Sequence, residues 1–227
     1  MIKEAVMKTA DLTIALSKGT LLQPTLKLLA GVGLPTAGIE ADSRQMVFSY
    51  ELSSGAQIKY IMCRPTDVPV YVEHGAADLG VVGKDVIVEE KRDVFELLDL
   101  GFGYCRCVIA VPQALSDLRL EDLNYKRIAT KFPHIAENFF CQQGMQVDLI
   151  KLHGNVELAP LMGLSDVIVD LVSTGRTLHE NHLQELLVIL ESTTRLICNP
   201  VSYRIKYRAV QTFIDLINQQ LEGEKIV

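Results

Sequence analysis

A short segment near residue 170 contains the residue types best suited to chemistry. An apolar run at 167–169 predicts a buried strand that ends in Asp170. A turn of small and hydroxyl-bearing residues follows at 173–175, and a helical pattern begins after it. Such a turn directs backbone N–H groups and the positive end of a helix dipole to one point, where a phosphate group can bind.

This segment favours a sugar phosphate over a free phosphate. Thr174 and Thr177 add hydroxyl donors for the phosphate. A carboxylate such as Asp170 cannot donate a hydrogen bond to a free phosphate, and its charge has the same sign. Ribose hydroxyls need an acceptor, and Asp170 supplies one. An ordinary strand–loop–helix connection capped by Ser and Thr is equally compatible with this segment taken alone.

Composition places the chain among globular proteins. Its 227 residues, 48% of them hydrophobic, suffice for one large domain or two small ones. A net charge of −6 without a dominant basic face excludes nucleic acid as the main partner. Anionic small substrates are still permitted, because they need only a few well-placed cations.

Three sequence features bear on the cellular compartment: membrane-spanning segments, a secretory signal and the use of cysteine. No apolar stretch approaches the roughly 20 residues that cross a bilayer, so no membrane association is expected. Charged residues interrupt positions 1–10, which do not form a secretory signal. The five cysteines lie mostly in apolar runs, which predicts buried free thiols, and the histidines form no metal-ligand pattern. We therefore expect a cytoplasmic protein without a protein-bound structural metal.

Strand-like and helix-like segments alternate along the chain, which predicts an α/β fold with mixed, mainly parallel sheets flanked by helices. We expect strands at 11–16, 47–52, 57–63, 78–82, 127–131, 147–152, 167–169 and 195–198, apolar runs at 97–100, 105–111 and 186–190, and helices at 21–30, 67–74, 133–143, 156–163, 178–183 and 203–221. Breaks near 101–103 and 191–194 predict two lobes separated by a cleft. Residues 1–103 with 193–227 form lobe I, and residues 104–192 form lobe II with the phosphate loop.

Several blocks resemble one family when they are taken together and in order. The turn after Asp170 resembles the phosphoribosyl-diphosphate (PRPP) loop of phosphoribosyltransferases, in which acids precede Thr-Gly-x-Thr. Type I enzymes usually have two adjacent acids there, whereas this chain has Val169 beside Asp170. The blocks at 15–19, 67–85, 128–131 and 154–160 are similar to those of ATP phosphoribosyltransferases, and the resemblance runs from about residue 12 to residue 203.

The resemblance implies a fold, a reaction and partners. The fold would be two α/β lobes like those of periplasmic binding proteins (type II). The reaction would be a pentosyl transfer, the first step of histidine biosynthesis: N1 of the ATP adenine is joined to C1 of the PRPP ribose, and pyrophosphate leaves, with Mg²⁺ on the substrate phosphates. The chain resembles the short form, which lacks the C-terminal regulatory domain. That form pairs as a homodimer and works with a regulatory subunit similar to histidyl-tRNA synthetase in a hetero-octamer.

The resemblance also assigns roles to individual residues. PRPP would contact Glu157, Asp170, Ser173, Thr174, Gly175, Arg176 and Thr177, whereas ATP and pyrophosphate would contact Lys18, Gly19, Arg44, Arg64 and Asp85. Asp170, Glu157, Arg44 and Lys18 would be catalytic. Ordinary alternatives are a helix-dipole partner for Glu157, a solvated lysine for Lys18, a surface residue for Arg44, and a local ion pair at 84–85.

One position departs from the family pattern, and two other functions stay open. The family usually places an arginine where this chain has Thr20, so a cation near the phosphates is missing. A non-catalytic, two-lobe solute-binding or effector-sensing module has the same fold, because fold alone does not fix function. A type I phosphoribosyltransferase is the other alternative, although Val169 stands where its second acid would be.

Overall fold

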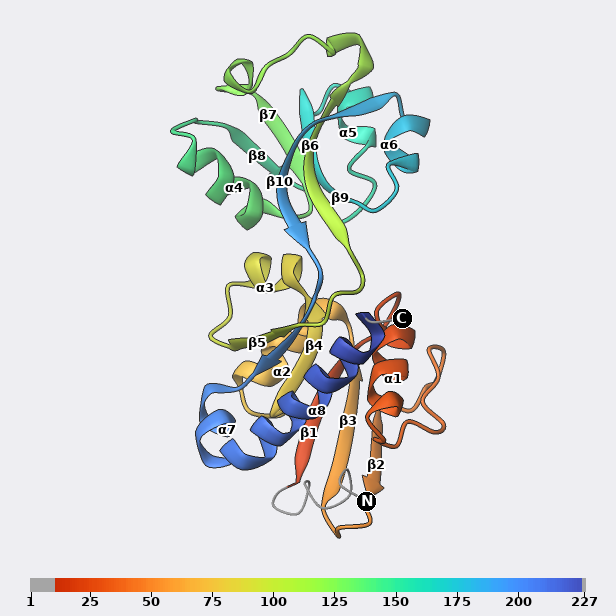
Figure 1. Cartoon of the computed structure of the whole chain (residues 1–227). Coiled ribbons are helices and arrows are strands. Elements are labelled where there is room, and N and C mark those ends of the chain that lie inside the picture. The colour runs from red at the N-terminus through yellow and green to blue at the C-terminus, as the bar shows by residue number, and fades with distance from the viewer. Residues whose placement is uncertain (1–10, 226–227) are drawn as a thin grey trace. The chain divides into compact units, whose positions relative to one another are not determined.

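The computed structural model describes residues 11–225, with side chains as far as residue 223. The expectation about a secretory signal concerns residues 1–10, which lie outside this range. The chain forms two compact units: the first combines the part up to Gly103 with the part from Thr193 onward, and the second is Tyr104–Ser192 (Figure 1). None of the helices between residues 11 and 225 combines the length and hydropathy that a membrane span requires.

The first unit contains a six-stranded sheet with the strand order β2-β3-β1-β4-β11-β5. Strands β3, β1 and β4 run parallel, whereas β2, β11 and β5 pair antiparallel with their neighbours. Its elements are β1 (Leu12–Ser17), α1 (Leu22–Gly31), β2 (Val47–Glu51), β3 (Gln57–Cys63), α2 (Val68–Glu73), β4 (Leu79–Gly83), α3 (Lys84–Glu90), β5 (Phe95–Asp99), β11 (Thr194–Cys198), α7 (Pro200–Ile205) and α8 (Tyr207–Lys225).

The second unit contains a five-stranded sheet with the order β10-β6-β9-β7-β8. Strands β9, β7 and β8 run parallel, and β6 lies antiparallel between β9 and β10. Its elements are β6 (Cys105–Pro112), β7 (Arg127–Thr130), α4 (Pro133–Gln142), β8 (Asp148–Lys151), α5 (Leu158–Leu161), β9 (Val167–Val172), α6 (Arg176–Glu180) and β10 (Leu183–Ser192).

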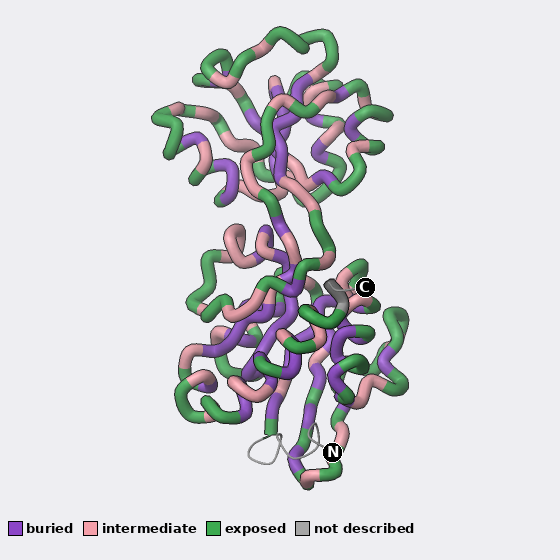
Figure 2. Tube along the Cα trace, viewed as in Figure 1, coloured by how far each residue is buried: buried purple, intermediate pink, exposed green. Residues whose placement is uncertain are grey.

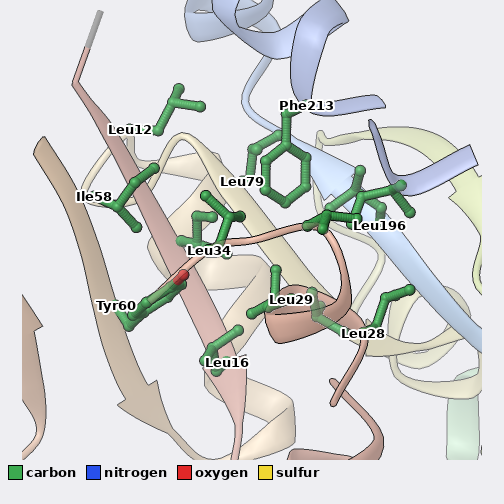
Figure 3. Packing of buried hydrophobic residues seen from close by; sticks show 14 of the residues in the cluster. Leu12, Leu16, Leu28, Leu29, Leu34, Ile58, Tyr60, Leu79, Leu196 and Phe213 are labelled. Atoms are coloured by element: carbon green, nitrogen blue, oxygen red, sulfur yellow. The ribbon is translucent and has the colours of Figure 1, made fainter. Parts of the chain in front are cut away.

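Strand β1 illustrates how the core of the first unit is built. Leu12 and Leu16 are buried against α1 and α8, in a cluster that includes Phe213 (Figure 3), whereas Ala15 packs with Val72 of α2 in a second cluster. A strand that is covered on both faces is apolar along most of its length, which explains why β1 lacks strict alternation. Burial of each large apolar side chain contributes about 1.5–3 kcal/mol. The central strands of both sheets are accordingly buried (Figure 2).

The helices differ from the sequence expectations where local residues set their limits. Helix α5 covers Leu158–Leu161 instead of 156–163, because Asn155 (φ 47°) and Gly163 (φ 67°) adopt left-handed conformations on either side. The final helix expected at 203–221 is two helices, α7 and α8, which are separated at Lys206. Helix α7 begins early because the side chain of Asn199 caps its first turn. Helix α3 was not expected.

Two features of the strands also differ. Strand β9 continues past Asp170 to Val172, so the acid lies within the strand instead of following it. The apolar run at 186–190 belongs to the ten-residue strand β10. The sheets are mixed: parallel pairing is confined to β3-β1-β4 and β9-β7-β8 and does not dominate as the sequence suggested.

Candidate active site

The parallel strands of the second unit bring the candidate PRPP residues to one edge. The carboxyl ends of parallel strands meet on the same side of a sheet, where α/β proteins bind ligands. Asp170 and the loop 173–177 lie at this end of β9, and Glu157 follows the carboxyl end of its neighbour-but-one, β8. Glu157 and the segment 170–177 therefore lie at the same edge of the sheet, although they belong to separate parts of the chain.

A pocket of about 230 Å³ joins these residues. It is lined by Glu157 and by the continuous stretch from Asp170 to Leu178, so every PRPP residue expected from the sequence contributes to it. Glu157 stands at the N-terminus of α5, but its side chain makes no capping hydrogen bond. Glu157 therefore lines the pocket without capping the helix, and its place at the start of α5 still allows the interaction with the helix dipole that was the ordinary alternative.

Asp170 is the most electrostatically perturbed acid of the pocket. Burial raises the pKa of its carboxyl above the ordinary value, and the nearby charge of Glu157 raises it further. Two interactions oppose the rise in pKa: Lys131 Nζ lies 3.7 Å from Asp170 Oδ1, and the backbone N–H of Leu171 donates to the same oxygen at 2.9 Å. An acid in this environment can accept hydrogen bonds from neutral hydroxyl groups.

The loop that follows is held by backbone conformation and by an ion pair. Gly175 adopts φ 78°, a left-handed conformation that glycine reaches without strain, and α6 begins directly after it. Arg106 binds Glu185 in a bidentate pair, with Nε–Oε2 at 3.0 Å and Nη2–Oε1 at 2.6 Å. The same guanidinium donates to the carbonyl of Ser173 at 3.5 Å, which ties the loop to β6 and β10. Helix α6 has only five residues, so its dipole is small. A phosphate at this loop would therefore depend mainly on hydrogen bonds from the backbone N–H groups and hydroxyl groups of the loop.

The candidate ATP residues of the first unit gather at the corresponding edge of its sheet. Lys18 follows β1, and its backbone N–H donates to the carbonyl of Cys63 at the end of β3 (2.9 Å), next to Arg64. Arg44 precedes β2, which runs antiparallel to β3 and therefore starts at this same edge. The ammonium of Lys18 donates to the carbonyl of Ser43 at 3.4 Å, which brings it to the Arg44 segment.

Other residues of this edge have more local roles. Asp85 is buried in the first turn of α3, where a carboxylate complements the helix dipole. Lys84 forms an ion pair with Glu96 of β5, which is a different partner from the neighbouring acid of the local ion pair expected at 84–85. Gly19 (φ 97°) and Thr20 are exposed directly after Lys18, and Thr20 brings no cation to the edge.

The structure adds residues that sequence reasoning missed. Lys131 and the pair Arg106–Glu185 contact the pocket residues, but only the strand register brings them there, because Glu185 lies 79 residues from Arg106 in the chain. The expectation of buried cysteines needs two corrections, since Cys141 is exposed and Cys105 is only half-buried. Burial raises the pKa of Cys63 and Cys198 to about 12. Within the described part of the chain, no group of three or more His, Cys, Asp and Glu side chains could hold a metal ion.

The two mixed sheets flanked by helices define an α/β protein of the periplasmic-binding-protein type. The alkanesulfonate-binding protein of Xanthomonas axonopodis pv. citri shares this fold, with a TM-score of 0.57 over 96% of this chain and 76% of its own, at 16% identity. A complex of ATP phosphoribosyl transferase (HisG:HisZ) from Thermotoga maritima contains a more similar chain, with a TM-score of 0.77 and 36% identity over 93% of this chain and 99% of that one.

Sequence comparisons identify the family. The family model for ATP phosphoribosyltransferase matches residues 64–222. The ATP phosphoribosyltransferase of Syntrophomonas wolfei is 67% identical over 212 residues, which cover 93% of this chain and 96% of the relative. That of Moorella thermoacetica is 52% identical over 97% of this chain and 98% of its own. The chain belongs to the ATP phosphoribosyltransferase family, whose members are pentosyltransferases of histidine biosynthesis that use a metal ion.

Proposed function

We propose that this chain is the catalytic subunit of a short-form ATP phosphoribosyltransferase. It condenses ATP with PRPP to give N1-(5-phosphoribosyl)-ATP and pyrophosphate, the first step of histidine biosynthesis. The observation that carries the proposal is the pocket in which Glu157 and Asp170 face a Thr-Gly-x-Thr loop, in a chain 67% identical to a named relative. Acids beside hydroxyl and N–H donors match a ligand that carries both ribose hydroxyls and a phosphate.

PRPP is assigned to the second unit. The 5′-phosphate would accept hydrogen bonds from the loop of Ser173, Thr174, Gly175, Arg176 and Thr177, whose backbone is fixed by Gly175 and by the Arg106 contact. The ribose hydroxyls would donate to Asp170, with Glu157 as the second acid on the same ligand. Charge-assisted hydrogen bonds of this kind are stronger than neutral ones.

ATP and the pyrophosphate group are assigned to the first unit. Lys18, Arg44 and Arg64 would bind phosphate oxygens at the strand edge, and Gly19 would let the chain approach them closely. Arg44 and Arg64 are exposed, as ligands for an incoming polyphosphate need to be. Asp85 is assigned a supporting position at the start of α3, next to the same edge.

The reaction is a displacement at the anomeric carbon. The lone pair of adenine N1 forms a bond to C1 of the ribose, and the C1–O bond breaks, with its electron pair leaving on pyrophosphate. Positive charge builds on the ribose ring, for which Asp170 and Glu157 are the proposed ligands, while negative charge builds on pyrophosphate, for which Lys18 and Arg44 are the proposed ligands. A neutral ring nitrogen needs no strong base, so alignment and electrostatic stabilisation supply most of the catalysis.

The metal ion is proposed to be Mg²⁺, which arrives on the substrate phosphates. Mg²⁺ is commonly bound through substrate phosphates with few protein ligands. Lys18, Arg44 and Arg64 are the proposed ligands for the phosphate oxygens that would carry the ion. When bound, the ion would neutralise part of the charge on the leaving pyrophosphate.

Partners and location complete the proposal. The Thermotoga maritima relative was solved as a HisG:HisZ complex, which supports a regulatory subunit of the same kind for this chain. We assign the chain to a hetero-octamer that contains homodimers of the catalytic subunit and a subunit similar to histidyl-tRNA synthetase, in the cytoplasm.

The test is pyrophosphate release from ATP and PRPP with Mg²⁺ by the purified chain, alone and with the partner subunit. Release that requires both substrates supports the proposal. A chain that binds one substrate but releases no pyrophosphate in either condition is a sensing module instead. Release with other nucleobases but not with ATP would indicate another phosphoribosyltransferase.

A further inference from the structure

Lys131 and Asp170 are neighbours at the carboxyl edge of the second sheet. Strands β7 and β9 are parallel, and Thr130 pairs with Val169, so the next residue of each strand falls side by side. Lys131 Nζ lies 3.7 Å from Asp170 Oδ1, and the side chains are 36% and 17% exposed. This contact is set by strand register and not by sequence proximity.

The charges around Asp170 come from few sources. Strand β7 contributes Lys131, the N-terminus of α5 contributes Glu157, and β9 itself contributes the N–H of Leu171. Strand β6 places the apolar Val108 opposite Asp170. The pocket is thus lined by two acids and by Arg176, and the ammonium group of Lys131 lies against Asp170. Burial and Glu157 favour the protonated acid, whereas Lys131 favours the carboxylate.

The contacts of Asp170 also distinguish its two oxygens. Lys131 and the N–H of Leu171 both engage Oδ1. Neither of them uses Oδ2. A carboxylate that is anchored through one oxygen can present the other to a ligand in a fixed direction, which reduces the entropy lost when the ligand binds.

We propose that Lys131 is a positioning residue of the active site, which favours the carboxylate form of Asp170 and anchors Oδ1 so that Oδ2 accepts the ribose hydroxyls of PRPP. The inference rests on the function proposed above for Asp170. A protonated Asp170 would lose part of its acceptor capacity and would no longer stabilise positive charge on the ribose ring. Lys131 also offsets one of two acidic charges in a pocket that must admit an anionic substrate.

The same pair of strands provides a matched control. At their opposite ends, Lys126 Nζ lies 3.9 Å from Asp166 Oδ1, with side chains that are 43% and 32% exposed. This pair also joins a lysine to an aspartate, but it lies at the edge away from the pocket, and Asp166 is more exposed and also accepts a hydrogen bond from the backbone N–H of Arg127 (2.9 Å). Lys126→Met therefore removes a lysine–aspartate contact from the same sheet without touching Asp170.

The experiment compares the parent chain with Lys131→Met, Lys131→Arg and Lys126→Met. Carboxyl ¹³C NMR follows the titration of Asp170 in the full-length chain without substrate, with the signal assigned by its loss in Asp170→Asn. An opposite charge at this distance lowers an acid's pKa by about 1–3 units, so Lys131→Met should move the Asp170 midpoint to higher pH by about one unit or more. Lys131→Arg should restore most of the shift, and Lys126→Met should cause none.

The second readout is the pH dependence of kcat/KM for PRPP. The acid limb should move to higher pH in Lys131→Met by the same amount as the Asp170 midpoint, and Lys131→Arg should reverse it. An unchanged Asp170 midpoint in Lys131→Met overturns the inference, and so does a shifted midpoint with an unchanged acid limb. If the parent chain releases no pyrophosphate, the proposed function fails, while the NMR measurement still decides whether Lys131 controls Asp170.

Discussion

Replacement of Asp170 by Asn should reduce the turnover of the chain without reducing its stability, which makes it an informative single substitution. The amide has nearly the shape of the carboxylate but carries no charge. If Asp170 stabilises positive charge on the ribose ring, the loss of one preorganised contact should reduce turnover by about 10²-fold or more. A 10²-fold loss corresponds to about 2.7 kcal/mol of transition-state stabilisation.

Unlike turnover, the free energy of unfolding should rise or stay unchanged in Asp170→Asn. Because burial raises the pKa of Asp170, the folded state binds its proton more tightly than the unfolded state does. Ionisation therefore lowers the free energy of unfolding as pH rises from the ordinary pKa of 3.8 through the folded value, and the loss is complete above the folded value. Asn removes this penalty. The raised pKa of Asp170 is the net result of burial and of the opposing Lys131 contact, so the loss of that contact is already included in this expectation.

The assay combines steady-state and single-turnover rates of pyrophosphate release with urea unfolding at pH 7 and pH 4. We expect Asp170→Asn to be at least as stable as the parent at pH 7, with a difference that shrinks towards pH 4. Rates within a few-fold of the parent would refute the role of Asp170. A loss of activity that accompanies a large loss of stability at pH 7 would refute the electrostatic reasoning.

Three other substitutions or additions test separate parts of the account. Thr20→Arg should raise the first-turnover rate of the isolated chain in rapid-mixing experiments, because a cation there strengthens contact with the departing pyrophosphate; an unchanged first turnover would mean that Lys18 and Arg44 suffice. Histidine should leave pyrophosphate release by the isolated chain unchanged and should inhibit only with the partner subunit, since inhibition needs a second site; strong inhibition of the chain alone contradicts the short-form proposal. Gly175 has φ 78°, so Gly175→Ala should lower the free energy of unfolding by about 1–2 kcal/mol and raise the KM for PRPP. Gly144, with φ 68°, is the control: Gly144→Ala should lower the free energy of unfolding by a similar amount without changing the KM.

Local patterns in the sequence were sufficient to predict much of the fold and the turn that follows β9. The apolar run of β1 and the turn around Gly175 are contiguous in the chain, and their conformations depend mainly on neighbouring residues. Helix ends were less predictable. The side-chain cap of Asn199 starts α7 earlier than its apolar pattern suggests, and the left-handed Asn155 shortens α5.

Contacts between distant strands could not be predicted in the same way. Arg106 meets Glu185 only because β6 pairs with β10, and Lys131 meets Asp170 only because β7 pairs with β9 in one register. A shift of that register by one residue would turn Lys131 to the opposite face, and the register depends on how two distant buried strands pack together. The sequence could therefore suggest the ligands of the phosphate but not the residues that support them.

The central claim is that the second unit binds PRPP through the acids and loop of a single pocket. The most direct measurement is a crystal structure of the chain with PRPP and Mg²⁺. The account predicts the 5′-phosphate on the N–H and hydroxyl groups of Ser173–Thr177 and the ribose hydroxyls on Asp170 Oδ2, with Lys131 still at Oδ1. A 5′-phosphate bound instead by Lys18 and Arg64, with the loop empty, would contradict it.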